Sequence, residues 1–161
     1  MLNSKILNIG CGADIRENCI NIDIQNLPGV DIVCNAWQIP LEDNYAEYII
    51  AQHILEYIPR GLTIRTLTEW VRVLQPQHHF EIRVADLTQL TKALYLNNIS
   101  PEIGLPHEMV ISLLYGTQRN NYDIKFNGFT SEFFQGILVG MGLRIVSIVT
   151  ENYDIIITAK K

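Results

Sequence analysis

The chain has 161 residues, of which 48% are hydrophobic, and it carries a formal net charge of −5. This size and composition predict a single domain over residues 1–161 with a substantial core, and the acidic balance argues against general affinity for nucleic acid or anionic membranes. No stretch approaches the roughly 20 apolar residues that span a bilayer, and no signal peptide is recognisable, so we expect a cytoplasmic protein.

The cysteine and histidine spacings indicate neither a disulfide framework nor a metal site. The three cysteines are Cys11, Cys19 and Cys34, and no two of them form a Cys-x-x-Cys pair. The four histidines lack the i, i+4 spacing with glutamate that marks a helical zinc site. We therefore expect reduced cysteines and no bound metal.

The first motif lies between Lys5 and Asp23, where two short apolar runs are joined through Gly10, Cys11 and Gly12. Glycine lets backbone N–H groups come close to a ligand and permits positive φ. Asp23 ends the second apolar run and can accept two hydrogen bonds from a ribose diol. A buried strand, a glycine turn and an acidic strand end predict a site for an adenosine-containing cofactor.

The length of this motif narrows the choice of cofactor. A dinucleotide fingerprint needs a third glycine, a phosphate-binding helix and an acidic residue roughly 20 positions on. Here position 15 is Ile15, and Asp23 follows Gly10 by 13 residues, which leaves too little room for a full helix and a strand. S-adenosylmethionine, which has ribose and adenine but no phosphate, therefore fits better than NAD. The alternative is a tight strand-to-strand turn in which Asp23 is only a strand terminus.

Beyond Asp23, predicted strands alternate with predicted helices. Apolar runs and period-2 alternation predict strands over residues 30–34, 46–51, 79–84, 144–149 and 154–158. Helical spacing of apolar side chains predicts two helices, with apolar faces at Leu67, Trp70, Val71 and Leu74 and at Phe133, Phe134, Ile137, Leu138 and Met141.

The helix boundaries have sequence signals of their own. Asp86 and Gln89 match a capping box at the start of a third helix, and an apolar stretch over residues 109–115 indicates a short helix. The last helix is expected from Thr130 to Met141, with Gly142 as its C′ residue.

This element order predicts an α/β fold. We expect a Rossmann-like, doubly wound and mostly parallel sheet with an antiparallel C-terminal edge, in which the first helix is shortened or absent. Residues 97–129, rich in Asn, Gly and Pro, are interpreted as a lid-like insertion.

Several short motifs together resemble a known family. In the order found in class I, Rossmann-like S-adenosylmethionine-dependent methyltransferases, the chain contains Leu7–Gly12, Ile20–Asp23, Ile39–Leu41, His53–Ile58 and Arg72–Pro76, followed by 115–118, 121–123, 128–130 and 141–143. It is most similar to a small bacterial group of predicted methyltransferases, some of which look associated with cell-surface glycan synthesis. The resemblance covers nearly the whole chain.

The resemblance implies roles for residues at the carboxyl ends of the strands. It implies that Gly10, Cys11 and Gly12 border the methionine part of the cofactor and that Asp23 binds the ribose. Ile24 would pack on one side of the adenine, and Asn35, Ala36 and Trp37 would lie at its other edge. Gln52 and His53 would face the sulfonium and the acceptor.

Methyl transfer from a sulfonium is an in-line displacement, so an enzyme contributes chiefly by alignment and exclusion of water. If the acceptor is a hydroxyl, His53 is the candidate base, the alternative being a residue that only caps its strand. Tyr115, Tyr122 and Lys125 are candidate substrate-binding residues on the lid, or else ordinary surface residues.

The favoured interpretation is a methyltransferase acting on a small-molecule or sugar-containing (glycan) acceptor. Departures from the family pattern at Gln77, His78 and Lys125 leave open a degenerate, non-catalytic domain that binds a nucleoside or a protein partner. A nicotinamide-dependent oxidoreductase is disfavoured by the missing third glycine. The acceptor and the oligomeric state are not encoded in any motif of the chain.

Overall fold

The computed structural model describes residues 4–99 and 105–161, with the backbone alone for 97–99. In chain order its strands and helices are β1 (Ile6–Ile9), β2 (Ile20–Asp23), β3 (Ile32–Val33), β4 (Ala46–Gln52), the 3₁₀ turns η1 (Leu55–Tyr57) and η2 (Arg60–Leu62), α1 (Thr63–Val73), β5 (Leu74–Ala85), α2 (Leu87–Ile99), α3 (His107–Tyr115), α4 (Ser131–Gly140), β6 (Arg144–Glu151) and β7 (Asp154–Lys160).

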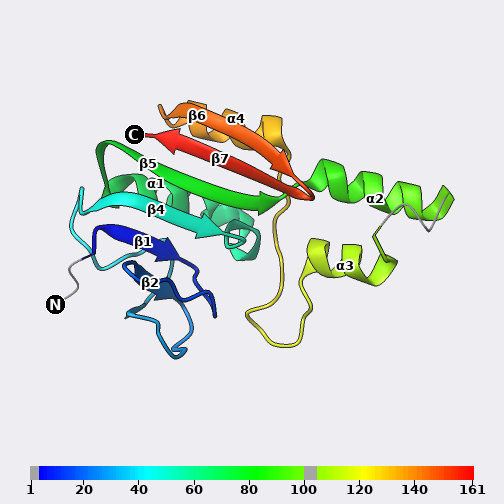
Figure 1. Ribbon diagram of the computed structural model, residues 1–161, viewed down its shortest axis with the longest axis horizontal. Helices are drawn as coiled ribbons and strands as arrows, with labels where there is room; N and C mark the ends of the chain where they lie inside the picture. Colours follow the sequence, from blue (N-terminus) through cyan, green and yellow to red (C-terminus); the bar gives the residue numbers. More distant parts are fainter. Residues whose placement is uncertain (1–3, 100–104) are drawn as a thin grey trace.

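Within the described residues, these strands form one sheet in the order β3-β2-β1-β4-β5-β7-β6 (Figure 1). The strands from β3 to β5 pair in parallel, whereas β7 is antiparallel to both β5 and β6. The predicted fold class, a doubly wound and mostly parallel sheet with an antiparallel C-terminal edge, is confirmed. The loss of the first helix is confirmed as well, because β1 is joined to β2 without a helix.

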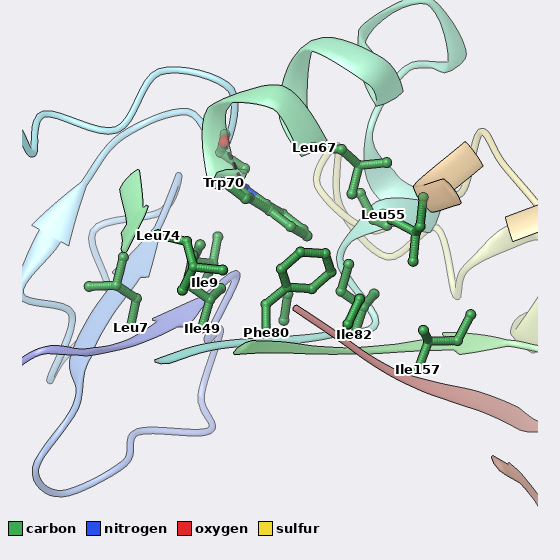
Figure 2. Packing of buried hydrophobic residues seen from close by; sticks show 14 of the residues in the cluster. Leu7, Ile9, Ile49, Leu55, Leu67, Trp70, Leu74, Phe80, Ile82 and Ile157 are labelled. Carbon is green, nitrogen blue, oxygen red and sulfur yellow. Dashed lines mark hydrogen bonds between the residues drawn. The ribbon is translucent and has the colours of Figure 1, made fainter. Parts of the chain in front are cut away.

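One face of the sheet carries the main core. Leu7, Ile49 and Phe80 lie side by side in the strand register of β1, β4 and β5, and each is at most 1% exposed. Figure 2 shows Trp70 of α1 lying over this row, and its indole N–H donates to the carbonyl of Ala36 at 2.9 Å. Burying each such side chain contributes about 1.5–3 kcal/mol, so this layer is the main source of stability.

The opposite face of the sheet is different. Ile50, Glu81 and Thr158 form the neighbouring row on β4, β5 and β7, and all three are partly exposed. Figure 1 looks onto this face and shows α1 and α4 behind the strands. Parallel strands are usually covered on both faces, so the alternation of apolar and polar residues here is what lets this face meet water.

The segment after β5 builds a separate small cluster beyond the sheet. Asp86 caps α2 through its Oδ1, which accepts a hydrogen bond from the N–H of Thr88 at 2.8 Å, as predicted. Leu90 of α2 packs with Val110 of α3, the predicted short helix. The lid-like insertion predicted around 97–129 lies partly outside the described residues and stays a prediction.

Some predicted boundaries and orientations are wrong. The third strand comprises only Ile32–Val33 instead of 30–34, and β5 begins at Leu74, because that residue is already extended and pairs with Ala46. Phe133 is 61% exposed because Phe134, one position on, takes the buried stripe of α4. The last helix is one residue shorter at each end than predicted, because Thr130 is its N-cap and Met141 its C-cap, whereas the C′ residue Gly142, with φ +80°, is as predicted.

Candidate functional site

A cavity of about 500 Å³ lies where the sheet reverses its strand order. Its walls come from the ends of β1, β2 and β4, from the stretch after β3, and from residues 120–126. In Figure 1 the segment that returns from α3 runs past the arrowheads of β1 and β4. Ligands of open α/β sheets bind in this position, so the cavity is the leading candidate site.

The turn after β1 requires glycine at two positions, for different reasons. A Cβ on Gly10 would lie 2.2 Å from Cδ1 of Ile54, so the turn packs too tightly there for any side chain. Gly12 has φ +50° and open space where a Cβ would be, so its backbone borders the cavity without obstruction. Both glycines therefore bring main chain, instead of side chain, to the wall of the site.

Asp23 is fixed at the end of β2 and is 8% exposed. Its Oδ2 accepts from the N–H of Gly12 at 2.8 Å, and its Oδ1 accepts from the N–H of Gln25 at 2.9 Å. Each carboxylate oxygen has a second lone pair, so the group can still accept from a ligand diol. Ile24, 46% exposed, adds an apolar surface next to the carboxylate.

Two buried asparagines hold the connection that replaces the first helix. Asn8 donates from Nδ2 to the carbonyl of Asp14 at 2.7 Å and to Oδ1 of Asn21 at 3.0 Å. The same Oδ1 of Asn21 accepts from the N–H of Arg16, and its Nδ2 donates to the Arg16 carbonyl. We did not predict these roles, although an asparagine in the middle of each short apolar run was a visible signal.

His53 directly follows β4 in the left-handed region, with φ +50°, and lines the cavity. Its Nδ1 lies 3.5 Å from Oε1 of Glu56, and its Nε2 lies 3.4 Å from Oδ2 of Asp154. Burial raises the pKa of Asp154, against the opposing effects of His53 and Arg83. The imidazole is thus set between two carboxylates, one from η1 and one from the start of β7.

Tyr57 and Asp123 add a polar contact that sequence reasoning missed. The hydroxyl of Tyr57 donates to Oδ1 of Asp123 at 3.2 Å, and both residues line the cavity. Burial and the nearby carboxylate raise the pKa of Tyr57 to about 12, so the hydroxyl stays protonated at neutral pH. Hydrogen bonds from Thr117 lower the pKa of Asp123. Asp123 lies within the 121–123 motif, which was the available signal.

The structure brings eight of the predicted site residues to the cavity wall: Gly10, Gly12, Asp23, Ile24, Ala36, Trp37, His53 and Tyr122.

Five predicted residues do not line this cavity. Cys11 is buried, which raises its pKa to about 11, and Asn35 is half-buried beside the wall. Gln52 accepts from Arg16 at 3.0 Å, and the alternation along β4 places it on the open face of the sheet. Tyr115 and Lys125 line a second, smaller cavity.

No metal or membrane feature accompanies the site. Over residues 4–99 and 105–161, no group of three or more His, Cys, Asp or Glu side chains is placed to hold a metal ion. No helix in the same residues is long and apolar enough to cross a membrane.

Comparison by sequence finds no matching family model and no significantly matching curated protein. Comparison by structure finds many similar folds. A methyltransferase from Methanosarcina mazei, described as S-adenosylmethionine-dependent, superposes with a TM-score of 0.67 at 18% identity, covering 100% of this chain and 93% of that one.

Two further solved structures show the range of chemistry on this fold. The 1,6-didemethyltoxoflavin-N1-methyltransferase of Burkholderia thailandensis, solved with 1,6-didemethyltoxoflavin and S-adenosylhomocysteine bound, has a TM-score of 0.66 at 12% identity and covers 97% of this chain and 70% of its own. The [4+2]-cyclase SpnF has a TM-score of 0.61 at 14% identity, with 97% and 73% coverage. At these identities the likeness shows the fold alone.

Proposed function

We propose that this chain, which has the fold of the class I S-adenosylmethionine-dependent methyltransferases, binds S-adenosylmethionine in the larger cavity and methylates a small-molecule or sugar-containing acceptor. The observation that carries this proposal is the carboxylate of Asp23, fixed by Gly12 and Gln25 at the end of β2 with lone pairs left for a ribose diol.

The residues present fit such a cofactor. A volume of about 500 Å³ lies within the range of about 300–1,000 Å³ that is typical of small-molecule sites. Asp23 would hold the ribose, Ile24 and Trp37 would pack on adenine, and the backbone from Gly10 to Gly12 would border the methionine part. The short connection after Gly12 offers no helix N-terminus for a phosphate, which agrees with a cofactor that has none.

The acceptor side of the cavity comes from His53 and from the segment 120–126. When bound, S-adenosylmethionine supplies a methyl group on a sulfonium, which needs no further activation. The chain's own residues then have to align the acceptor and exclude water, and Tyr122 and Phe126, both more than half exposed, can close over an acceptor. If the acceptor is a hydroxyl, His53 takes its proton after its ring turns one nitrogen from Glu56 or Asp154 toward the acceptor.

Calorimetric titration with S-adenosylmethionine and S-adenosylhomocysteine tests the first half of this proposal. We expect micromolar binding to the wild-type chain and a loss of at least about tenfold for Asp23→Asn, since hydrogen bonds to a charged group contribute about 1.5–3 kcal/mol. Asp43→Asn is the matched control, because Asp43 is 71% exposed, forms an ion pair with Arg72 and lies outside the cavity. If a folded wild-type chain binds neither compound, the proposal is wrong.

A non-catalytic binding domain is the second candidate, and the surroundings of His53 favour it. Both ring nitrogens face carboxylates, so neither is free to meet an acceptor without a rearrangement. By contrast, Gln77 and His78 belong to the beginning of β5, at the opposite end of that strand from the cavity. Transfer of labelled methyl groups to any component of a cell extract, lost in Asp23→Asn, would exclude this candidate.

A further inference from the structure

The acceptor side of the larger cavity contains a carboxylate but no cationic side chain. Among the described residues that line this cavity there is no Lys or Arg, whereas Asp123 belongs to the segment 120–126 of its wall. Asp123 is partly exposed, and hydrogen bonds from Thr117 lower its pKa, so the side chain is charged at neutral pH. A ligand on this side of the cavity therefore meets a negative charge.

Two cationic side chains in the same region are paired with carboxylates of their own. Nζ of Lys125 lies 3.9 Å from Oε1 of Glu56, and Lys125 lines the second, smaller cavity instead of the larger one. The guanidinium of Arg83 lies 3.0 Å from the carboxylate of Glu151 and 3.8 Å from that of Asp154. Carboxylates thus outnumber these cations, and the acceptor side of the cavity keeps a negative charge while its histidine is neutral.

Tyr57 adds a hydrogen-bond acceptor beside this charge. Its hydroxyl donates to Oδ1 of Asp123 at 3.2 Å, so its single proton is already used. The lone pairs that remain on the hydroxyl and on the carboxylate can accept hydrogen bonds from a ligand. Tyr57, Tyr122 and Phe126 also line the cavity, and the faces of such aromatic rings attract cations. An ammonium group, which has a positive charge and several N–H donors, matches all of these features.

We propose that the methyl acceptor is an amino alcohol, such as an amino sugar, and that Asp123 selects it by the charge of its ammonium group; this inference rests on the proposed function. A protonated amine has no lone pair with which to attack a methyl group, so the ammonium serves for recognition and a hydroxyl of the same molecule is methylated. The hydroxyl oxygen takes the methyl group, the electron pair of the carbon–sulfur bond stays on sulfur, and the hydroxyl proton passes to His53. Acceptors with a carboxylate or phosphate at this position are repelled.

Three cyclohexanols are suitable probes, because they differ only at the opposite ring carbon, which has an amino, a hydroxyl or a carboxylate group. Titration of each into the protein saturated with S-adenosylhomocysteine, followed by NMR of the isoleucine methyl groups, measures both affinity and location. We expect the amine to bind at least about tenfold more tightly than the diol, because charge-assisted hydrogen bonds are roughly twice as strong as neutral ones, and the carboxylate to bind most weakly. The shifts should include Ile124, which lies in the wall next to Asp123. Equal affinities, or shifts confined to Ile24 beside Asp23, would overturn the proposal.

Asp123→Asn removes the charge and keeps an oxygen that can accept from Tyr57. The preference for the amine over the diol should disappear in this variant. It should persist in Asp43→Asn, which removes a carboxylate outside the cavity, and in Tyr57→Phe, which loses one hydrogen bond but keeps the charge. A preference that survives in Asp123→Asn, or one that is lost equally in Tyr57→Phe, would refute the role of the Asp123 charge.

Failure of the proposed function would be seen separately. If S-adenosylhomocysteine does not bind, calorimetry shows this before any probe is added. The same three titrations into the protein without S-adenosylhomocysteine then still decide whether the amine is preferred at Ile124.

Discussion

The two faces of the sheet differ in what covers them, although they belong to the same strands. On β7, Ile155, Ile157 and Ala159 are fully buried under the helix layer, while Ile156 and Thr158 between them are partly exposed. A parallel sheet normally has helices on both faces, and its strands read as continuous apolar runs. Here the strands of the C-terminal half alternate instead, so one face is stabilised by packing and the other by polar side chains.

The open face also contains the connection that takes the place of the first helix. On β1 and β2 the residues of this face are Asn8 and Asn21, which are buried although no helix covers them, because the segment around Asp14 and Arg16 folds over them. The guanidinium of Arg16 also donates a hydrogen bond to Gln52, the next residue of this face on β4. Hydrogen bonds from polar side chains therefore stabilise this face of the sheet, whereas apolar packing stabilises the other face.

Adjacent isoleucines on β7 allow the comparison to be tested with one type of substitution. Ile157→Ala should lower the free energy of unfolding by about 2–5 kcal/mol, because it leaves a cavity in the packed layer. Ile156→Ala should cost about 1 kcal/mol or less, because its side chain is already partly in water. Urea unfolding at several protein concentrations measures both values. Equal losses would mean that the open face is covered in solution, for example by a second copy of the chain.

A smaller effect is expected for the asparagines of the connection. Asn21→Ala removes the acceptor of the Arg16 N–H and the partner of Asn8, so it should cost about 1–3 kcal/mol. Asp14→Ala is the control in the same loop, since this side chain is 62% exposed and forms an exposed ion pair with Arg16. We expect it to change the stability by less than about 0.5 kcal/mol. Similar losses in the two variants would show that the asparagine bonds do not hold the loop.

The sequence was sufficient for features that depend on local pattern. The alternation of strands and helices, the cap at Asp86, the C′ residue Gly142 and the missing first helix all follow from spacing along the chain. The glycine turn and Asp23 were also identifiable, because a turn and the strand that follows it are close in sequence.

Features that depend on long-range contacts were not predictable. Asp154 reaches His53 only because β7 inserts between β5 and β6, an order that no local pattern encodes. Lys125, expected in the acceptor pocket, instead lies beside Glu56 because the segment after α3 folds back toward η1. The exposure of one sheet face was also missed, since it follows from which helices are absent and not from the strands themselves.

The smallest expected effect is a difference in pH dependence between two carboxylates, one on each side of the sheet. On α1, hydrogen bonds from Arg72 and from the N–H of Ile39 lower the pKa of Glu69, so this group stabilises the fold above its unfolded pKa, and the stabilisation is lost as the pH falls through the folded value. At the end of the open face, burial raises the pKa of Asp154. The folded chain therefore binds that proton more tightly than the unfolded chain, and stability falls as the pH rises through the interval above 3.8.

Thermal melting of Glu69→Gln and Asp154→Asn between pH 3 and pH 7 measures these opposite signs. Glu69→Gln should be less stable than wild type at neutral pH, by up to about 1 kcal/mol, and the difference should shrink as the solution is acidified. Asp154→Asn should be as stable as wild type in acid and slightly more stable at neutral pH, because it removes a carboxylate that is desolvated more than it is paired. A loss of stability at neutral pH in Asp154→Asn would mean that the contacts of Asp154 with His53 and Arg83 outweigh the cost of its burial. These contacts at the end of the open face would then stabilise the fold about as much as the ion pair on α1 does.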